Sequence, residues 1–129
     1  MKIIHVSAVV LCNSLEEILI VQRPTHKEMA GLWEFPGGKI ESSETPEQAL
    51  QRELAEELAI TVEIGNLKPL CFVSHRYSTF HLIMLVYRCN RWKGEITLKE
   101  GQQAVKWVSP SQLKDFPMPP ADLPIFEYL

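Results

Sequence analysis

Three glutamates, Glu53, Glu56 and Glu57, stand three and four residues apart in a segment that has the composition of a helix. An α-helix turns by about 100° per residue, so positions i, i+3 and i+4 project from one side of it. Carboxylate oxygens are the ligands that Mg²⁺ prefers in proteins. The spacing therefore predicts a divalent-metal site on one side of a helix.

The helix that carries these glutamates is expected over residues 46–58. Thr45 is a suitable N-cap, Pro46 takes the first helical position, where its missing N–H is harmless, and Gln48 can complete a capping box. Apolar residues that recur every four positions would pack on a sheet, namely Leu50, Leu54 and Leu58. One side of the helix is thus expected to pack, and the neighbouring side to carry the carboxylates.

The glutamates belong to a longer pattern, which reads Gly-x5-Glu-x7-Arg-Glu-x-x-Glu-Glu and includes Gly38, Glu44 and Arg52. The alternative is a solvent-exposed acidic helix, in which like charges at i and i+4 cost only roughly 0.2–0.5 kcal/mol. At ordinary residue frequencies, a chance match to the whole pattern is on the order of one in a million. The complete pattern therefore favours the metal site.

The pattern resembles the signature of the Nudix hydrolases, Gly-x5-Glu-x7-Arg-Glu-U-x-Glu-Glu-x-Gly-U, in which U is a bulky aliphatic residue. One position differs, because Ala59 stands where the signature has its last glycine, a residue suited to a left-handed helix cap. The resemblance covers nearly the full chain, including residues 34–41 and 116–122, and is to the MutT-like branch. It implies an α/β fold, the Nudix-type α/β/α sandwich with a mixed β-sheet, as a single hydrolase domain over residues 1–129.

The resemblance also implies the metal ligands. Mg²⁺, for which Mn²⁺ could substitute, would be held by these residues: Glu53, Glu56, Glu57, the backbone carbonyl of Gly37 or Gly38, and Glu100. Bound metal would lower the pKa of a water and neutralise charge on the phosphates. The catalytic base would be Glu53, Glu57 or Glu100, and the sequence does not choose among them. The alternative for Glu100 is a solvated loop glutamate.

Two further groups of residues are expected around the metal. Glu44 and Arg52 would act as supports, since Arg52 could pair with Glu44 or Glu56 and so orient the carboxylates. Arg23 is the preferred phosphate-binding residue and Lys39 the second choice, because a cation is needed to position phosphate groups. Each of the three cations could instead be an ordinary surface charge.

Phe35 and Asp122 are the expected base-binding residues. Purine-specific MutT-like proteins often have asparagine where this chain has Asp122. An ionised aspartate only accepts hydrogen bonds, which suits the N–H groups of guanine but also the exocyclic amine of cytosine. The alternative for Asp122 is a helix cap.

The preferred function is that of a Mg²⁺-dependent pyrophosphohydrolase that converts 8-oxo-dGTP, and dGTP, to the nucleoside monophosphate and pyrophosphate, and so sanitises the nucleotide pool. One alternative is a pyrophosphohydrolase of CTP or a modified pyrimidine nucleotide, and another is a broad activity on nucleoside diphosphate compounds. A non-catalytic Nudix-like module that only recognises nucleotides is the alternative from a different class.

Composition sets limits on partners and location. The 129 residues carry a net charge of −3, which argues against a nucleic-acid polymer as partner and leaves a small nucleotide. We find no secretory signal and no apolar run of the roughly 18 residues that a membrane span needs, so a cytoplasmic location without membrane association is expected. A monomer is expected, with a dimer as the alternative. The cysteines are expected to be reduced, and are Cys12, Cys71 and Cys89.

The remaining elements follow from apolar runs and turn residues. Strands or extended segments are expected over residues 3–11, 17–22, 32–36, 61–64, 70–75, 80–89 and 104–108. A short helix is expected over residues 110–116, and a closing helix, capped by Asp122, over residues 122–129.

Overall fold

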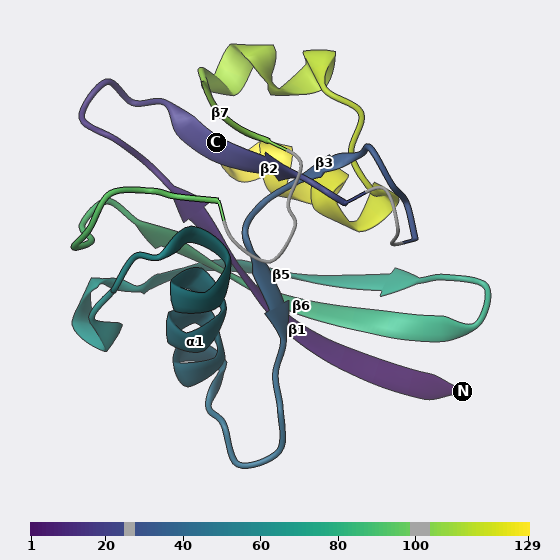
Figure 1. Cartoon of the computed structure of the whole chain (residues 1–129). Helices are drawn as coiled ribbons and strands as arrows, with labels where there is room; N and C mark the ends of the chain where they lie inside the picture. The colour runs from purple at the N-terminus through teal and green to yellow at the C-terminus, as the bar shows by residue number, and fades with distance from the viewer. Residues whose placement is uncertain (25–27, 99–103) are drawn as a thin grey trace.

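The computed structural model describes residues 1–24, 28–98 and 104–129 (Figure 1). The strands are β1 (Lys2–Leu11), β2 (Ile18–Gln22), β3 (Trp33–Glu34), β4 (Gly37–Lys39), β5 (Lys68–Arg76), β6 (Phe80–Cys89) and β7 (Val105–Val108). The helices are the α-helix α1 (Pro46–Leu58) and the 3₁₀ helices η1 (Ile64–Asn66), η2 (Pro110–Asp115) and η3 (Pro120–Tyr128). Residue 100, expected to be a metal ligand, lies outside the described residues.

The strands form two sheets. The four-stranded sheet has the order β4-β1-β6-β5 and is mixed, because β1 and β6 run parallel while the other neighbours run antiparallel. The three-stranded sheet has the order β3-β2-β7 and is antiparallel. The expected mixed sheet is therefore confirmed, and a second sheet accompanies it.

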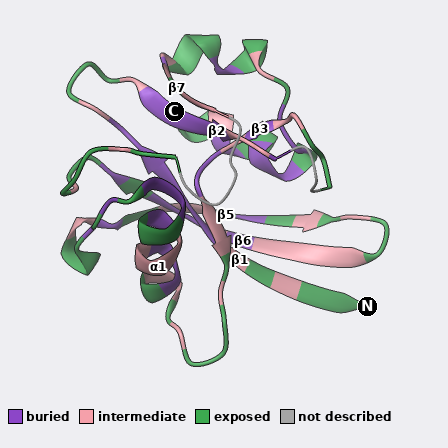
Figure 2. Ribbon diagram, in the orientation of Figure 1, coloured by how far each residue is buried: buried purple, intermediate pink, exposed green. Residues whose placement is uncertain are grey.

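Two cores lie on opposite faces of the strands. Side chains alternate along a strand, so neighbours in β1 enter different cores. Val9 belongs to the cluster that contains Leu54 of α1, whereas Val10 belongs to the cluster that contains Ile125 of η3. Figure 2 shows the buried residues gathered in the central parts of the strands. The α/β/α layering is confirmed, with the difference that the layer opposite α1 is a 3₁₀ helix.

The bounds and the cap of α1 match the sequence prediction. Gln48 donates its backbone N–H to Thr45 Oγ1 at 3.1 Å, and Thr45 N–H donates to Gln48 Oε1 at 2.9 Å, which completes the capping box. Ala59 ends the helix in the left-handed conformation, with φ 59° and ψ 31°, and donates its N–H to the carbonyl of Ala55. Alanine thus adopts the turn for which the signature has glycine, at a cost in backbone strain.

Two expectations about secondary structure are wrong. Residues 61–64 form no strand, because the segment pairs only through a single bridge between Thr61 and Lys93 before η1 begins. The closing helix begins at Pro120, so Asp122 lies inside it and is not its cap. That helix is 3₁₀ rather than α, and Pro124 inside it has no N–H for an α-helical bond.

Only two residues of the expected segment 32–36 form a strand, and the strand that follows the segment belongs to the other sheet. Trp33 and Glu34 pair with β2, while Gly37 to Lys39 pair with β1. Phe35 and Pro36 therefore cross from one sheet to the other. This crossing places the glycines of β4 beside β1, where α1 also packs.

The start of β1 and the β5–β6 hairpin extend beyond the layers that cover them (Figure 1). Figure 2 shows these strand ends as exposed or intermediate rather than buried. The cysteines are free thiols, as expected. In the described ranges, no helix is long and apolar enough to cross a membrane.

Candidate metal and nucleotide site

A side chain at position 38 of β4 would collide with the flexible end of Glu53, which reaches over from α1. A Cβ atom added to Gly38 would lie 2.4 Å from Cδ and 2.6 Å from Oε1 of Glu53. A Cβ atom added to Gly37, whose φ is +153°, would lie 2.1 Å from the carbonyl oxygen of Ser7. The missing Cβ atom at Gly38 therefore leaves the space in which the Glu53 carboxylate lies, whereas the missing Cβ atom at Gly37 allows β4 to approach the backbone of β1.

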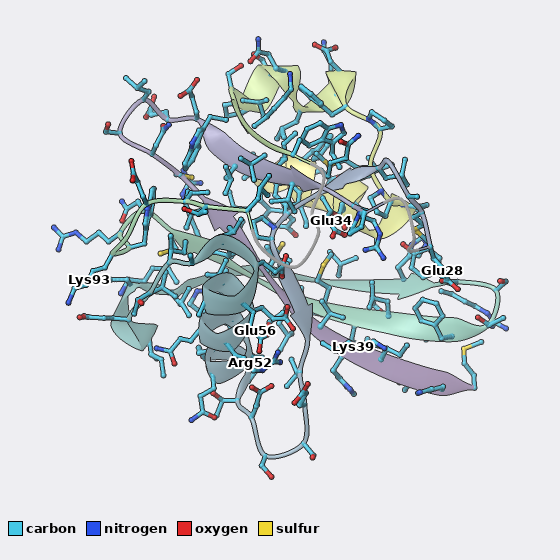
Figure 3. All side chains as sticks on the ribbon, viewed as in Figure 1. Glu28, Glu34, Lys39, Arg52, Glu56 and Lys93 are labelled. Atoms are coloured by element: carbon cyan, nitrogen blue, oxygen red, sulfur yellow. The ribbon has the colours of Figure 1, made fainter. Side chains whose placement is uncertain are left out.

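The guanidinium of Arg52 connects the carboxylates of this region. Its Nε and Nη2 donate to the two carboxylate oxygens of Glu44 at 2.7 and 2.9 Å. Its Nη1 donates to Glu53 Oε1 at 2.8 Å and to Glu56 Oε2 at 3.4 Å, and Nη2 also donates to the carbonyl of Lys39 at 3.0 Å. Figure 3 shows Arg52 and Glu56 side by side on α1. The expected pairing of Arg52 is present, and it involves both Glu44 and Glu56.

The pair of Arg52 and Glu44 is stabilised in its charged form. The hydrogen bond from Arg52, followed by that from the backbone of Glu41, lowers the pKa of Glu44 to about 2. The hydrogen bonds to Glu44 and Glu53 raise the pKa of Arg52. The Glu44 carboxylate and the Arg52 guanidinium therefore stay charged as a pair throughout the physiological pH range.

The glutamates of α1 offer the right donors for a hard divalent cation. Glu57 is buried, at 4% exposure, while the side chains of Glu53 and Glu56 are 17% and 43% exposed. In the part of the chain that the structure describes, no three side chains of His, Cys, Asp or Glu converge on a single ion position. Glu53 and Glu56 instead face Arg52. A bound ion would have to compete with this guanidinium for the same carboxylate oxygens.

The expected phosphate-binding cations lie in different places. Arg23 follows β2 and donates from Nη1 to Glu34 Oε2 and from Nε to the carbonyl of Glu28, both at 2.8 Å. Lys39 ends β4, and its carbonyl accepts from Arg52. Figure 3 shows Lys39 close to the cluster around Arg52, with Glu28 and Glu34 apart from it. The structure therefore places the backbone carbonyl of Lys39, but not Arg23, in contact with the Arg52 guanidinium.

Asp122 and Phe35, the two residues predicted to bind the base, lie in contact with each other. The Asp122 side chain is 7% exposed, and its Oδ2 accepts the backbone N–H of Phe35 at 3.3 Å. The Phe35 ring is buried and makes an edge contact with Phe126, with centroids 6.4 Å apart. Next to Asp122, Ala121 donates its N–H to the hydroxyl of Tyr77 at 3.2 Å.

Burial changes the chemistry of Asp122. Burial, and then the nearby charge of Glu34, raise the pKa of Asp122 to about 7. Near neutral pH this carboxyl therefore occurs in both protonation states. The neutral form donates a hydrogen bond as well as accepting one, which the ionised form cannot do.

Sequence reasoning missed two residues near these groups. Glu34 is the ion-pair partner of Arg23, and nothing in its local sequence distinguished it. Ser7 is fully buried beside Gly38, and the signal available for it was a lone polar residue within the apolar segment 6–11.

A separate cavity of about 470 Å³ contains none of the predicted site residues. It lies beyond the C-terminal end of α1, and its lining residues are Thr61, Glu63, Asn66, Asn90, Arg91, Trp92 and Lys93.

Comparison with known proteins gives consistent matches. A family model described as "NUDIX domain" matches residues 7–128. An 8-oxo-dGTP diphosphatase of Proteus vulgaris is 44% identical over 100 residues, which are 78% of this chain and 88% of that protein. A CTP pyrophosphohydrolase of Escherichia coli is 38% identical over 128 residues, 98% of this chain and 91% of that protein. The crystal structure of a MutT NUDIX hydrolase from Burkholderia pseudomallei superposes with a TM-score of 0.89 at 27% identity, covering 100% of this chain and 99% of that one.

Proposed function

The chain belongs to the Nudix family and is a hydrolase of phosphorus-containing anhydrides, and from this premise we propose that its substrate is 8-oxo-dGTP. Hydrolysis would yield the nucleoside monophosphate and pyrophosphate and so remove an oxidised nucleotide from the pool. The observation that carries the choice of substrate is the buried Asp122 carboxyl beside the backbone of Phe35.

Nudix hydrolases generally need divalent metal ions, and we propose Mg²⁺ here, with Mn²⁺ as a substitute. Glu53, Glu56 and Glu57 would hold it together with a carbonyl of Gly37 or Gly38 and with Glu100. Two observations support this set, namely the hard oxygen donors on one side of α1 and the absence of a Cβ atom at Gly38, next to Glu53. When bound, the ion would lower the pKa of a water and neutralise phosphate charge.

The chain's own residues would then orient these groups. Arg52 donates hydrogen bonds to both carboxylate oxygens of Glu44. These bonds fix the position of the Arg52 guanidinium beside Glu53 and Glu56. This arrangement restricts the directions of both carboxylates. A proton from the attacking water would go to Glu53, Glu57 or Glu100. Lys39 is exposed beside Arg52 and its carboxylate partners, and would bind a terminal phosphate. Arg23 would bind the phosphate closer to the base.

The base would lie against Phe35 with its hydrogen-bonding edge at Asp122. An 8-oxoguanine edge presents a carbonyl acceptor next to N–H donors. A carboxyl with a pKa of about 7 can serve both, since its neutral form donates and accepts. This property replaces the asparagine of many purine-specific relatives and supports the choice of a purine.

Hydrolysis of CTP or a modified pyrimidine nucleotide is the second candidate. It is favoured by the 38% identity to the CTP pyrophosphohydrolase over 98% of the chain. The ionised form of Asp122 would accept the exocyclic amine of cytosine. The two candidates thus differ in which protonation state of Asp122 binds the base.

The test is a panel of kcat/KM values with Mg²⁺ for 8-oxo-dGTP, dGTP, CTP, 5-methyl-dCTP and ADP-ribose. We expect the highest value for 8-oxo-dGTP. Glu53→Gln should abolish turnover while the far-UV circular dichroism stays that of the wild type, whereas Glu63→Gln, at an exposed glutamate outside the cluster, should leave kcat/KM unchanged. A higher kcat/KM for a pyrimidine would overturn the choice of substrate, and an active Glu53→Gln variant would overturn the metal centre.

The cytoplasmic location, the monomeric state and the extent of the domain over residues 1–129 stay predictions. Gel filtration with light scattering would measure the oligomeric state directly.

A further inference from the structure

The hydroxyl of Ser7 is buried without a hydrogen-bond partner among the described residues. Ser7 is 0% exposed, and among the described residues its Oγ is a buried side-chain oxygen that has no hydrogen-bond partner. Buried polar groups nearly always have a partner, because an unsatisfied one loses its bonds to water and gains nothing. A hydroxyl in this position therefore points to a partner that arrives with a ligand.

Strand pairing locates the Ser7 side chain. Ser7 lies directly opposite Gly38 in the pairing of β1 with β4. Alternation along β1 places Ser7 on the same face as Val9, which packs in the core under α1. Opposite residues of an antiparallel pair have Cβ positions about 4.5–5.5 Å apart. The Ser7 side chain therefore lies next to the space beside Gly38, on the helix side of the sheet.

That space contains the Glu53 carboxylate. All three heavy atoms of the carboxylate group lie within 2.4–2.7 Å of the Cβ position of Gly38. In this arrangement Glu53 Oε1 accepts from Arg52 at 2.8 Å. The Glu53 carboxylate therefore lies beside the β4 position that faces Ser7, and it is hydrogen-bonded to the Arg52 guanidinium.

We propose that Ser7 is a positioning residue of the metal centre, whose hydroxyl donates to the Glu53 carboxylate when a divalent cation draws that carboxylate away from Arg52. The inference rests on the proposed function, because it needs the metal ion. Ser7 would not bind the metal ion itself. Its hydroxyl would hydrogen-bond to the carboxylate that does, and so fix the direction of that carboxylate. In the metal-free protein the same hydroxyl gains no hydrogen bond, so its benefit appears only on metal binding.

The experiment compares the wild type, Ser7→Ala and Ser7→Ala/Glu53→Gln. Ser74→Ala is the matched control, because the exposed Ser74 hydroxyl on β5 is hydrogen-bonded to His81 on β6, outside the group formed by Arg52 and its carboxylate partners. Mn²⁺ affinity is measured by electron paramagnetic resonance without nucleotide, and the thermal midpoint is measured in EDTA and in saturating Mg²⁺.

We expect Ser7→Ala to weaken Mn²⁺ binding about tenfold and Ser74→Ala to leave it within about twofold. In EDTA the midpoint of Ser7→Ala should equal or exceed that of the wild type, because an unsatisfied hydroxyl has been removed. The rise in midpoint on adding Mg²⁺ should be smaller than in the wild type. In the Glu53→Gln background, the Ser7→Ala change should cause no further loss of affinity.

Three results would overturn the proposal while leaving the proposed function intact. They are an unchanged Mn²⁺ affinity in Ser7→Ala, an equal fall of its midpoint with and without metal, and a further tenfold loss in the double variant. Failure of the wild type to bind Mn²⁺ or to hydrolyse any nucleotide would instead overturn the proposed function, and this inference with it.

Discussion

Replacing Asp122 by asparagine is expected to remove a large part of the pH dependence of folding stability. Burial raises the pKa of Asp122 from an ordinary value of 3.8 to about 7. At about 1.4 kcal/mol for each pH unit, a displacement of this size is on the order of 4 kcal/mol. Asparagine has nearly the same shape, can accept the Phe35 N–H, and does not ionise.

The sign of the effect follows from proton binding. Because the folded pKa is the higher one, the folded state binds more protons than the unfolded state between pH 3.8 and about 7. The associated stability is fully present below pH 3.8 and is lost as the pH rises through about 7. Between pH 5 and pH 8 the wild type should therefore lose about 3 kcal/mol relative to Asp122→Asn.

Urea denaturation at half-unit steps from pH 5 to pH 8 measures this difference. Each free energy of unfolding is compared with the value of the same protein at pH 5. As the pH rises, the free energy of unfolding of the wild type should fall further than that of Asp122→Asn. Asp115→Asn, at an exposed aspartate in η2, is the matched control and should run parallel to the wild type. Parallel curves for the wild type and Asp122→Asn would refute the argument that the Asp122 carboxyl is neutral when buried.

Three further changes test the structure around α1. Ala59→Gly should raise the free energy of unfolding in urea by about 1 kcal/mol, because position 59 has φ 59°, and a lower value would contradict the strain assigned to alanine there. Gly38→Ala should lower kcat/KM at least about tenfold with little change in thermal midpoint, because the new Cβ displaces the flexible end of Glu53 rather than backbone. Equal activity would show that the carboxylate position is unimportant. Arg52→Lys should lower kcat/KM about tenfold, because lysine cannot bind both oxygens of Glu44, and Mn²⁺ titration would show whether metal affinity falls with it.

The sequence predicted α1 well because its determinants are local. Thr45 and Gln48 reach each other within one turn, and the leucines and glutamates are sorted onto neighbouring sides by the helical repeat alone. Alanine is less suited than glycine to the left-handed cap, so the sequence did not predict the conformation of Ala59. The structure shows that Ala59 adopts the conformation expected of glycine. The long strands could also be predicted from the sequence, because they are apolar runs bounded by turn residues.

Short and edge segments were predicted poorly. Ile60 and Val62 alternate into the core as strand residues do, yet Thr61 between them makes a single bridge, because no strand of the described residues pairs with the segment. The end of β3 at Glu34, and the start of β4 in the other sheet at Gly37, could not be foreseen either. Pairing partners are set by the positions of other strands, and periodicity within a segment does not reveal them.

By itself, the sequence determined which side chains α1 presents and that three carboxylates share one side, because these relations extend over a single turn of helix. Tertiary structure decided what those carboxylates meet. The approach of Glu53 to Gly38, the burial of Ser7 opposite that glycine, and the bond between Asp122 and Phe35 across 87 residues all depend on strand register and layer packing. Such contacts exist only once distant segments are held together, so no local pattern in the chain predicts their geometry or the shifted pKa that results.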